Sequence, residues 1–285
     1  MKIIDILKDR RSFSFEVFPP KMDQSLEPLS ETLTHLKEFK PDFISCTYGA
    51  GGTNKGRSEE VCSMIKRMEL NPMTHFTCIG NTKGDILNIV ERYRNLGVKN
   101  ILALRGDIPH GLDGTNGDFS HGDQLVAFLR ENYPDLCIAA ACYPEKHIEA
   151  LTMEDDLKNL KRKVSCGADF LMTQLCYDVD NYARFREMAG KYGVDLPVVV
   201  GIMPVLNKDG VIRMTVTNGC SIPMELAEII GRYGDAPQDF KKAGKEYTVK
   251  LIDRYKDAGV EGIHIYSLNK YKDVADIIEA SNIRR

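Results

Sequence analysis

The 285-residue sequence predicts an α/β fold, a (β/α)8 TIM barrel that forms a single domain over residues 1–285. Two observations predict it: short apolar runs that end in polar residues recur along the chain, and amphipathic, charge-rich stretches separate them. The runs are FSFEVF (13–18), FISCTY (43–48), THFTCI (74–79), ILALRGD (101–107), IAAACY (138–143), FLMTQL (170–175), VVVGIMP (198–204) and IHIYSLN (263–269). Most of them recur at about 30 residues, the size of one βα unit. A doubly wound open sheet shares this alternation and is the structural alternative.

The stretches between the apolar runs have the periodicity of helices. We expect helices at 26–39, 57–69, 83–96, 122–132, 153–166, 181–192 and 208–218. In the third of these, Ile86, Ile89 and Val90 share one face and charged side chains occupy the other. The interval before the last run is longer than the others and holds an extra segment at 223–233 and a long helix at 238–258. A short helix precedes the first run, and another, at 272–280, follows the last.

The composition is that of an ordinary globular protein, with 43% hydrophobic and 28% charged residues. The net charge of −3 gives no general attraction to nucleic acid, and no run approaches the ~20 apolar residues of a membrane span. The first residues, MKIIDILKDRRSF, lack the long apolar stretch of a signal peptide. We therefore expect a cytoplasmic protein with no nucleic-acid or membrane partner.

The eight cysteines form no CxxC pair, and most lie within apolar strand or helix patterns. This placement favours reduced, buried thiols over disulfides. A zinc site needs closely spaced cysteine and histidine ligands, and the sequence has no such cluster. We expect no metal centre.

Glu16 is the first candidate for catalysis. It alternates with Phe13, Phe15 and Val17 along the first run, so its side chain points to the opposite face, the interior of a barrel. A carboxylate in that position is costly unless it is paired or protonated. Burial is expected to raise its pKa, which suits a general acid near neutral pH. A structural salt bridge inside the barrel is an equally open interpretation.

Polar residues at the ends of other runs indicate a ligand pocket, because a barrel brings the ends of its strands to one face. The fourth run ends in Arg105, Gly106 and Asp107, where the glycine allows a ligand to approach the backbone closely; a solvated turn is the alternative. Gln174, at the end of the sixth run, carries an amide that can pair with the edge of a heterocycle. The glycine-rich stretch at 49–52 lacks the spacing of a dinucleotide fingerprint.

The fifth run leads into a second group of polar residues. Tyr143 and His147 offer a flat ring and an imidazole beside the predicted pocket. On the following helix, Asp156, Asn159 and Lys163 share one face, and Arg162 adds a second cation. This face is able to hold a diphosphate. An exposed helix face without a ligand explains the same pattern.

Taken together and in order, the strings SFEVFPPK, TYGAGG, HFTC, LRGD, YPEKH, DLKNLKRKV and TQLCYD resemble methylenetetrahydrofolate reductase of the bacterial, flavin-dependent type. The resemblance runs from about residue 13 to residue 270. It implies a TIM barrel that binds FAD and reduces 5,10-methylenetetrahydrofolate to 5-methyltetrahydrofolate. Eukaryotic members add a C-terminal domain that binds S-adenosylmethionine, and because this sequence ends with the barrel we expect that control to be absent.

The resemblance also implies roles for individual residues. Glu16 matches the family's general acid, and Asp107 matches the aspartate beside the flavin that also contacts the pterin. The positions that line the FAD site are matched by Tyr48, Ala50, His75, Arg105, Gly106, Tyr143, His147 and Ala150, and further FAD contacts by Asp156, Asn159, Arg162 and Lys163. Thr47 matches a contact on the nicotinamide side, and Gln174 one shared by nicotinamide and folate.

Three positions near the end of the barrel depart from the best-known bacterial pattern. Gly210 stands where a glutamine contacts the substrate, and Met214 where a phenylalanine packs on it. Lys270 stands where an arginine often contacts the folate, and it keeps the charge but lacks the bidentate fork. We therefore expect unusual substrate binding there.

The resemblance implies methylenetetrahydrofolate and NADH or NADPH as substrates, and a homo-oligomer or a subunit of a one-carbon enzyme complex. Two alternatives to this reductase stay open. One is a flavin-bearing subunit that takes electrons from a partner protein, and the other is a folate-binding methyltransferase barrel without flavin.

Overall fold

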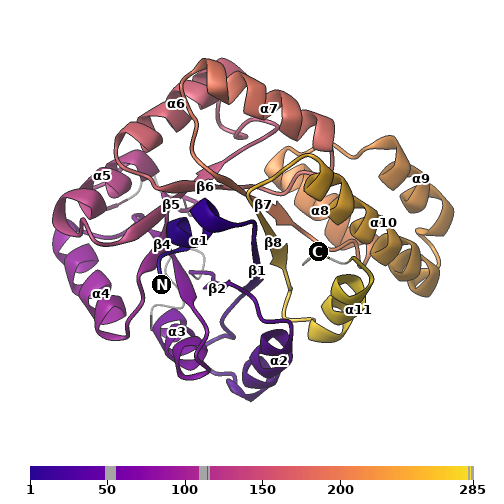
Figure 1. Cartoon of the computed structure of the whole chain (residues 1–285), viewed down its shortest axis with the longest axis horizontal. Coiled ribbons are helices and arrows are strands. Elements are labelled where there is room, and N and C mark those ends of the chain that lie inside the picture. The colour runs from indigo at the N-terminus through magenta and orange to yellow at the C-terminus, as the bar shows by residue number, and fades with distance from the viewer. Residues whose placement is uncertain (49–55, 109–113, 115, 282, 284–285) are drawn as a thin grey trace.

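The computed structural model describes residues 1–48, 56–108, 114, 116–281 and 283, and its strands form a closed parallel barrel (Figure 1). The strands are β1 (Ser12–Val17), β2 (Phe43–Cys46), β3 (Pro72–Thr77), β4 (Asn100–Leu104), β5 (Cys137–Cys142), β6 (Phe170–Thr173), β7 (Val198–Ile202) and β8 (Gly262–Tyr266). Each pairs with the next in parallel, and β8 pairs with β1 to close the barrel. The predicted (β/α)8 barrel is confirmed, and the open-sheet alternative is wrong because the first and last strands pair and the sheet has no edge.

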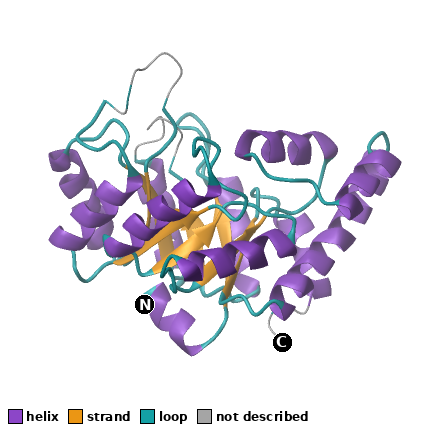
Figure 2. Ribbon diagram, turned by 90° about the horizontal axis from the view of Figure 1, so that it is seen from above, coloured by secondary structure: helices purple, strands orange, loops and turns teal. Residues whose placement is uncertain are grey.

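The helices surround the strands, as the view from above shows (Figure 2). They are α1 (Ile3–Asp9), α2 (Glu27–Glu38), α3 (Arg57–Arg67), α4 (Lys83–Asn95), α5 (Gly122–Asn132), α6 (Met153–Ser165), α7 (Val179–Lys191), α8 (Lys208–Asn218), α9 (Met224–Tyr233), α10 (Pro237–Asp257) and α11 (Tyr271–Ser281). The expected helices are confirmed, with small differences at their ends. Helix α7 begins before the expected residue 181 because the side chain of Asp178 accepts from the backbone N–H groups of Asp180 and Asn181. The extra segment at 223–233 forms α9.

Alternation along the strands separates two apolar layers. Phe13, Phe15 and Val17 of β1 pack with the surrounding helices, which leaves Ser12, Ser14 and Glu16 for the barrel interior. The interior near the starts of the strands is filled by a separate apolar cluster that includes Phe43 of β2, Met73 of β3 and Phe170 of β6. The predicted inward direction of Glu16 follows from this arrangement.

Helix α1 closes the end of the barrel where the strands begin. Its Ile3 and Leu7 pack into the interior cluster. Asn100, at the start of β4, accepts a hydrogen bond from the backbone N–H of Ile3 at 2.9 Å and donates to the carbonyl of Met1 at 3.2 Å. Because α1 fills this end, a ligand has access at the opposite end, where the strands finish.

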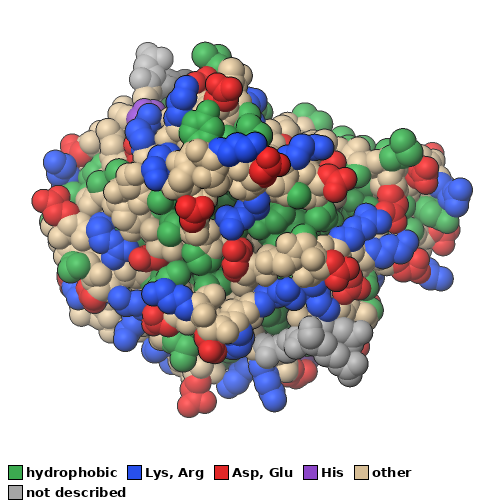
Figure 3. Space-filling view, turned by 45° about the horizontal axis from the view of Figure 1, so that its top comes forward, with side chains coloured by type: hydrophobic (Ala, Val, Ile, Leu, Met, Phe, Trp, Pro, Cys, Tyr) green, Lys and Arg blue, Asp and Glu red, His purple; other side chains and the backbone are tan. Residues whose placement is uncertain are grey.

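The cysteines are free thiols and most of them are buried, as their apolar surroundings indicated. Among the described residues, no group of three or more His, Cys, Asp or Glu side chains is arranged to hold a metal ion. Nor does that part of the chain contain a helix long and apolar enough to cross a membrane. On the face drawn in Figure 3, acidic and basic side chains are interspersed.

Candidate active site

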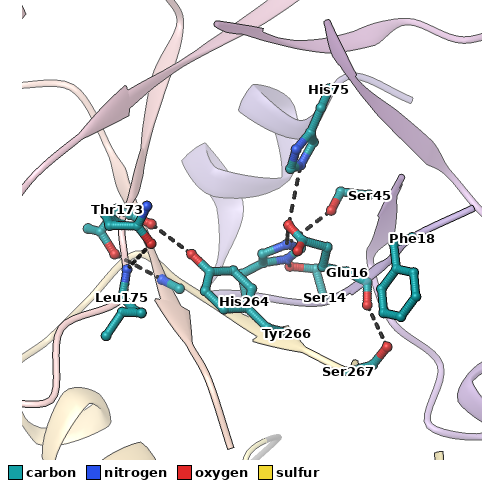
Figure 4. A network of polar contacts seen from close by, with 12 residues as sticks. Ser14, Glu16, Phe18, Ser45, His75, Thr173, Leu175, His264, Tyr266 and Ser267 are labelled. Atoms are coloured by element: carbon teal, nitrogen blue, oxygen red, sulfur yellow. Dashed lines mark hydrogen bonds and ion pairs between the residues drawn. The ribbon is translucent and has the colours of Figure 1, made fainter. Parts of the chain in front are cut away.

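Glu16 lies near the end of β1, inside the barrel, with a histidine on either side (Figure 4). One of its carboxylate oxygens, Oε2, is 3.4 Å from Nε2 of His75 in β3 and 3.8 Å from Nε2 of His264 in β8. Its side chain is 21% exposed. The backbone is fixed by Ser267, whose N–H and hydroxyl both donate to the carbonyl of Glu16. The carboxylate is therefore held in place and still reachable from the mouth of the barrel.

The pKa of Glu16 differs from the sequence-based expectation. Burial favours the neutral acid and raises the pKa, but interaction with His264 and the charge of His75 outweigh it, so the pKa lies below its usual value. The expected upward shift is wrong because it considered burial without the two histidines. Burial likewise lowers the pKa of His75, although Glu16 opposes that change. Glu16 therefore has the two histidine neighbours that the salt-bridge interpretation requires.

A cavity of about 390 Å³, here called the β4–β5 cavity, lies over the ends of β4 and β5 and against α5 and α6. Eight sequence-predicted cofactor residues line it: Arg105, Tyr143, His147, Ala150, Asp156, Asn159, Arg162 and Lys163. Further lining residues were not predicted: Ala103, Leu104, His121, Gly122, Asp123, Ala141 and Glu149. The proposed cofactor residues from runs four and five and from helix 153–166 are therefore neighbours in the fold.

Lys163 places a partly buried cation on the wall of the β4–β5 cavity. Its Nζ donates to the carbonyl of Ala141 at 3.0 Å and lies 5.4 Å from the centre of the Tyr143 ring. Burial lowers the pKa of Lys163, and the nearby carboxylate of Asp156 opposes this change. Asp156 also accepts from the backbone N–H of His147 at 3.0 Å, which ties the loop after β5 to α6.

Two further cations of the cavity are paired with acids. Arg105 forms a bidentate ion pair with Glu149, with N···O distances of 2.5 and 2.7 Å, and the bond to Arg105 lowers the pKa of Glu149. Nε of Arg162 contacts Oδ2 of Asp123 at 3.2 Å. These two acids could not be predicted from the sequence, because Asp123 and Glu149 belong to different segments from the arginines that they contact.

The start of α5 also opens onto the cavity. A Cβ added to Gly122, the first residue of α5, would lie 3.4 Å from the backbone nitrogen of Arg105, so the helix begins close against the end of β4. The unpaired N–H groups of a helix N-terminus favour negative charge. A helix start, Lys163, Arg105 and Arg162 thus surround one hollow.

A second hollow of about 250 Å³, here called the β7–β8 cavity, lies near β1, β7, β8 and α8. It contains all three positions that depart from the bacterial pattern, Gly210, Met214 and Lys270. Its walls are mainly apolar and include Phe18, and Arg213 adds a second cation. Asn207 caps α8 by accepting from the N–H of Gly210 at 2.7 Å, so residue 210 serves as part of the helix start.

Several sequence-predicted residues line neither of these two cavities. Asp107 is exposed after β4, and Gln174 uses its amide oxygen to accept from the N–H of Leu175 at 2.8 Å. Tyr48 packs edge-on against Phe76, and the carbonyl of Thr47 accepts from Ser58. Gly106 has a positive φ of 91°, and a Cβ there would clash with the side chain of Ile79. Ala50 lies outside the described residues.

The family model for methylenetetrahydrofolate reductase matches residues 2–282. The chain belongs to this family. It is 34% identical over 258 residues to the 5,10-methylenetetrahydrofolate reductase of Escherichia coli, a match that covers 90% of this chain and 86% of that protein. It is 33% identical over 297 residues to methylenetetrahydrofolate reductase (NADH) 1 of Arabidopsis thaliana, which covers 98% of this chain and 50% of the plant protein. The chain thus spans about half the length of its plant and fission-yeast relatives.

Among solved structures, the chain is similar to a Clostridium thermocellum protein that binds two copies of 5-methyl-5,6,7,8-tetrahydrofolic acid. The TM-score is 0.66 at 16% identity, and the match covers 100% of this chain and 99% of that one. At this identity the likeness supports the fold.

Proposed function

We propose that the protein reduces 5,10-methylenetetrahydrofolate to 5-methyltetrahydrofolate, with FAD as cofactor, NADH or NADPH as hydride source and a ping-pong order of half-reactions. Membership of the family supports this activity. The observation that carries it in the structure is Glu16, a partly exposed carboxylate fixed between two histidines at the mouth of the barrel. The bound methyltetrahydrofolate of the Clostridium thermocellum neighbour is consistent with a folate ligand.

The β4–β5 cavity suits the diphosphate part of FAD in its chemistry. Its volume of about 390 Å³ falls within the usual range of small-molecule sites. Lys163, Arg162, Arg105 and the start of α5 supply the positive charge and the N–H groups that a diphosphate requires. Tyr143 offers a flat wall. We propose that these residues hold the cofactor, which, when bound, supplies the acceptance and donation of hydride.

The β7–β8 cavity is the proposed place for part of the folate. Its apolar walls suit an aromatic ring, and Lys270 and Arg213 suit the carboxylates of a glutamate tail. A lysine binds a carboxylate as a point charge, so this chain would hold the tail with less directional control than a protein with arginine at the same position. Asp107, which follows β4, and Gln174, which follows β6, are proposed to contact the pterin.

Glu16 is the proposed proton donor. The reaction breaks the bond between N10 and the bridging methylene carbon, and N10 must gain a proton as it leaves. A carboxylic acid at Glu16 would supply that proton, and N5 would then share its electrons with the methylene carbon as an iminium ion. Hydride addition to this carbon gives the methyl group. Each turnover therefore consumes one proton from solvent.

The test is Glu16→Gln, assayed in two separate half-reactions under anaerobic conditions. Oxidation of the reduced flavin by methylenetetrahydrofolate should slow by about 10²-fold to 10⁴-fold, the usual contribution of a general acid. Flavin reduction by the nicotinamide should be unchanged, because it needs no such acid. Glu154→Gln, an exposed change on α6, is the matched control. A Glu16→Gln protein that oxidises its flavin with folate at the wild-type rate would refute the proposed role.

A further inference from the structure

His264 is a fully buried histidine in the barrel interior to which the proposed reaction gives no role. It lies on β8, opposite Ser14 of β1 in the strand register. Its Nδ1 is 2.7 Å from the hydroxyl of Ser14, and its Nε2 is 3.1 Å from the hydroxyl of Ser45 in β2 (Figure 4). Its ring stacks on the ring of Phe43, with 5.6 Å between the two ring centres. Both ring nitrogens therefore have partners, and the orientation of the imidazole is fixed.

Two hydroxyls hold the two ring nitrogens. The hydroxyl of Ser14 lies 3.3 Å from the carbonyl of Ile263 and can donate to it, which leaves its oxygen able to accept from Nδ1–H of His264. Ser45 faces Nε2, and a hydroxyl can accept from Nε2–H or donate to a bare Nε2. Nε2 is also the nitrogen that faces Glu16, with Oε2 at 3.8 Å.

Other titratable groups around Glu16 are poor sources of a proton near neutral pH. The pKa of His75 is lowered, mainly by burial, so its ring holds a proton less readily than an exposed histidine does. Burial raises the pKa of Tyr266 and of Cys46 well above their usual values, so both hold their protons. Glu16 itself has a lowered pKa and is a carboxylate in the open site. A general acid in that state needs a neighbour that keeps a proton for it.

We propose that His264 holds the proton that Glu16 delivers to the substrate, so that the two side chains share one proton across the Nε2···Oε2 contact. The separation is 3.8 Å, which is longer than a direct hydrogen bond, so the pair has to close when substrate covers the carboxyl. The proton then moves from Nε2 to Oε2 and on to N10, which leaves a neutral imidazole and a carboxylate. After product release, the pair regains one proton from solvent. The inference rests on the proposed function.

His264 acts through Glu16 and does not touch the substrate, so it is a positioning residue as well as the store of the proton. A purely structural role would need hydrogen bonding alone. His264→Gln separates the structural role from the proton-holding role, because the amide can bond to Ser45 and Glu16 but cannot carry the extra proton. His35→Gln, the same change at a partly exposed histidine stacked on Tyr271, is the matched control.

The first readout needs no turnover: titration of the ¹³C-labelled Glu16 carboxyl by NMR, in wild type and His264→Gln. The pKa of Glu16 should rise in the variant, because the imidazole that helps to lower it is gone. The second readout is the oxidation of reduced flavin by methylenetetrahydrofolate. It should slow by about 10-fold or more, with a changed pH profile, while flavin reduction by the nicotinamide stays at the wild-type rate. The double variant with Glu16→Gln should be no slower than Glu16→Gln alone.

Each other result overturns the proposal in a recognisable way. An unchanged Glu16 titration, or a His264→Gln protein with wild-type folate kinetics, shows that no proton is shared. Equal slowing of both half-reactions shows a structural role only. If His264→Gln does not fold, Ser14→Ala removes the acceptor for Nδ1–H and must still slow the folate half-reaction selectively. A wild-type protein whose reduced flavin is not oxidised by methylenetetrahydrofolate refutes the proposed function instead. The Glu16 titration then still reports on the interaction between Glu16 and His264.

Discussion

Replacing Lys163 by methionine tests whether the β4–β5 cavity is the cofactor site. Methionine keeps an unbranched stem of similar length and removes the ammonium group. In the structure, that group donates to the carbonyl of Ala141 at 3.0 Å and lies 5.4 Å from the centre of the Tyr143 ring, in the lining of the cavity. The change therefore removes one partly buried positive charge from the place proposed for the diphosphate and leaves the shape of the cavity nearly the same.

The size of the effect follows from the kind of interaction lost. A hydrogen bond to a charged group contributes about 1.5–3 kcal/mol, which corresponds to about 10-fold to about 100-fold weaker binding of FAD. Stability of the cofactor-free protein is affected by two opposing changes. The Ala141 carbonyl loses its donor, but the cost of burying a charge, seen in the lowered pKa of Lys163, also disappears. We expect the loss in FAD affinity to exceed the loss in folding stability.

Flavin fluorescence titration of the cofactor-free protein measures this affinity, and the absence of tryptophan from the sequence simplifies the protein's own fluorescence. Lys158→Met, on the exposed side of the same helix, is the matched control, because its ammonium lies 3.8 Å from Asp155 and faces solvent. Equal Kd values for Lys163→Met and Lys158→Met would refute the assignment of the cavity to the cofactor.

Two further predictions concern the other side of the barrel. Met214→Phe adds an aromatic wall to the β7–β8 cavity and should lower the KM for methylenetetrahydrofolate by roughly 2-fold to 10-fold in steady-state assays, and an unchanged KM would place the substrate elsewhere. Gly201→Ala places a methyl group against the hydroxyl of Tyr266, which donates to the Thr173 carbonyl at 3.0 Å, and should destabilise the protein by about 1–3 kcal/mol in urea unfolding. Gly231→Ala, with open space around the added methyl group, is its control; equal stability of the two variants would contradict this packing argument.

The parts of the site that come from local patterns could be predicted from the sequence. Alternation along one strand places Glu16 inside the barrel, since Phe13 and Phe15 occupy the outer face. The polar face of one helix places Asp156 and Lys163 at the same cavity. These relations depend on residues close together in the chain, so the periodicity of a strand or a helix determines them.

Contacts between distant segments were not visible in the sequence. His264 lies within an apolar run and gave no signal, because its partners Ser14 and Ser45 come from strands at the other end of the chain. The direction of the pKa shift of Glu16 was wrong for the same reason, since it depends on two histidines from β3 and β8. Glu149 was not predicted either, because only the fold brings it to Arg105.

We propose that this barrel passes hydride from a reduced nicotinamide to methylenetetrahydrofolate through a bound flavin. An anaerobic absorbance titration of the purified protein tests this transfer. We expect a yellow protein whose flavin bands are bleached by NADH or NADPH and restored by methylenetetrahydrofolate, with one 5-methyltetrahydrofolate formed for each flavin reoxidised. A colourless protein that binds no FAD, or a bleached flavin that methylenetetrahydrofolate leaves reduced, would contradict it.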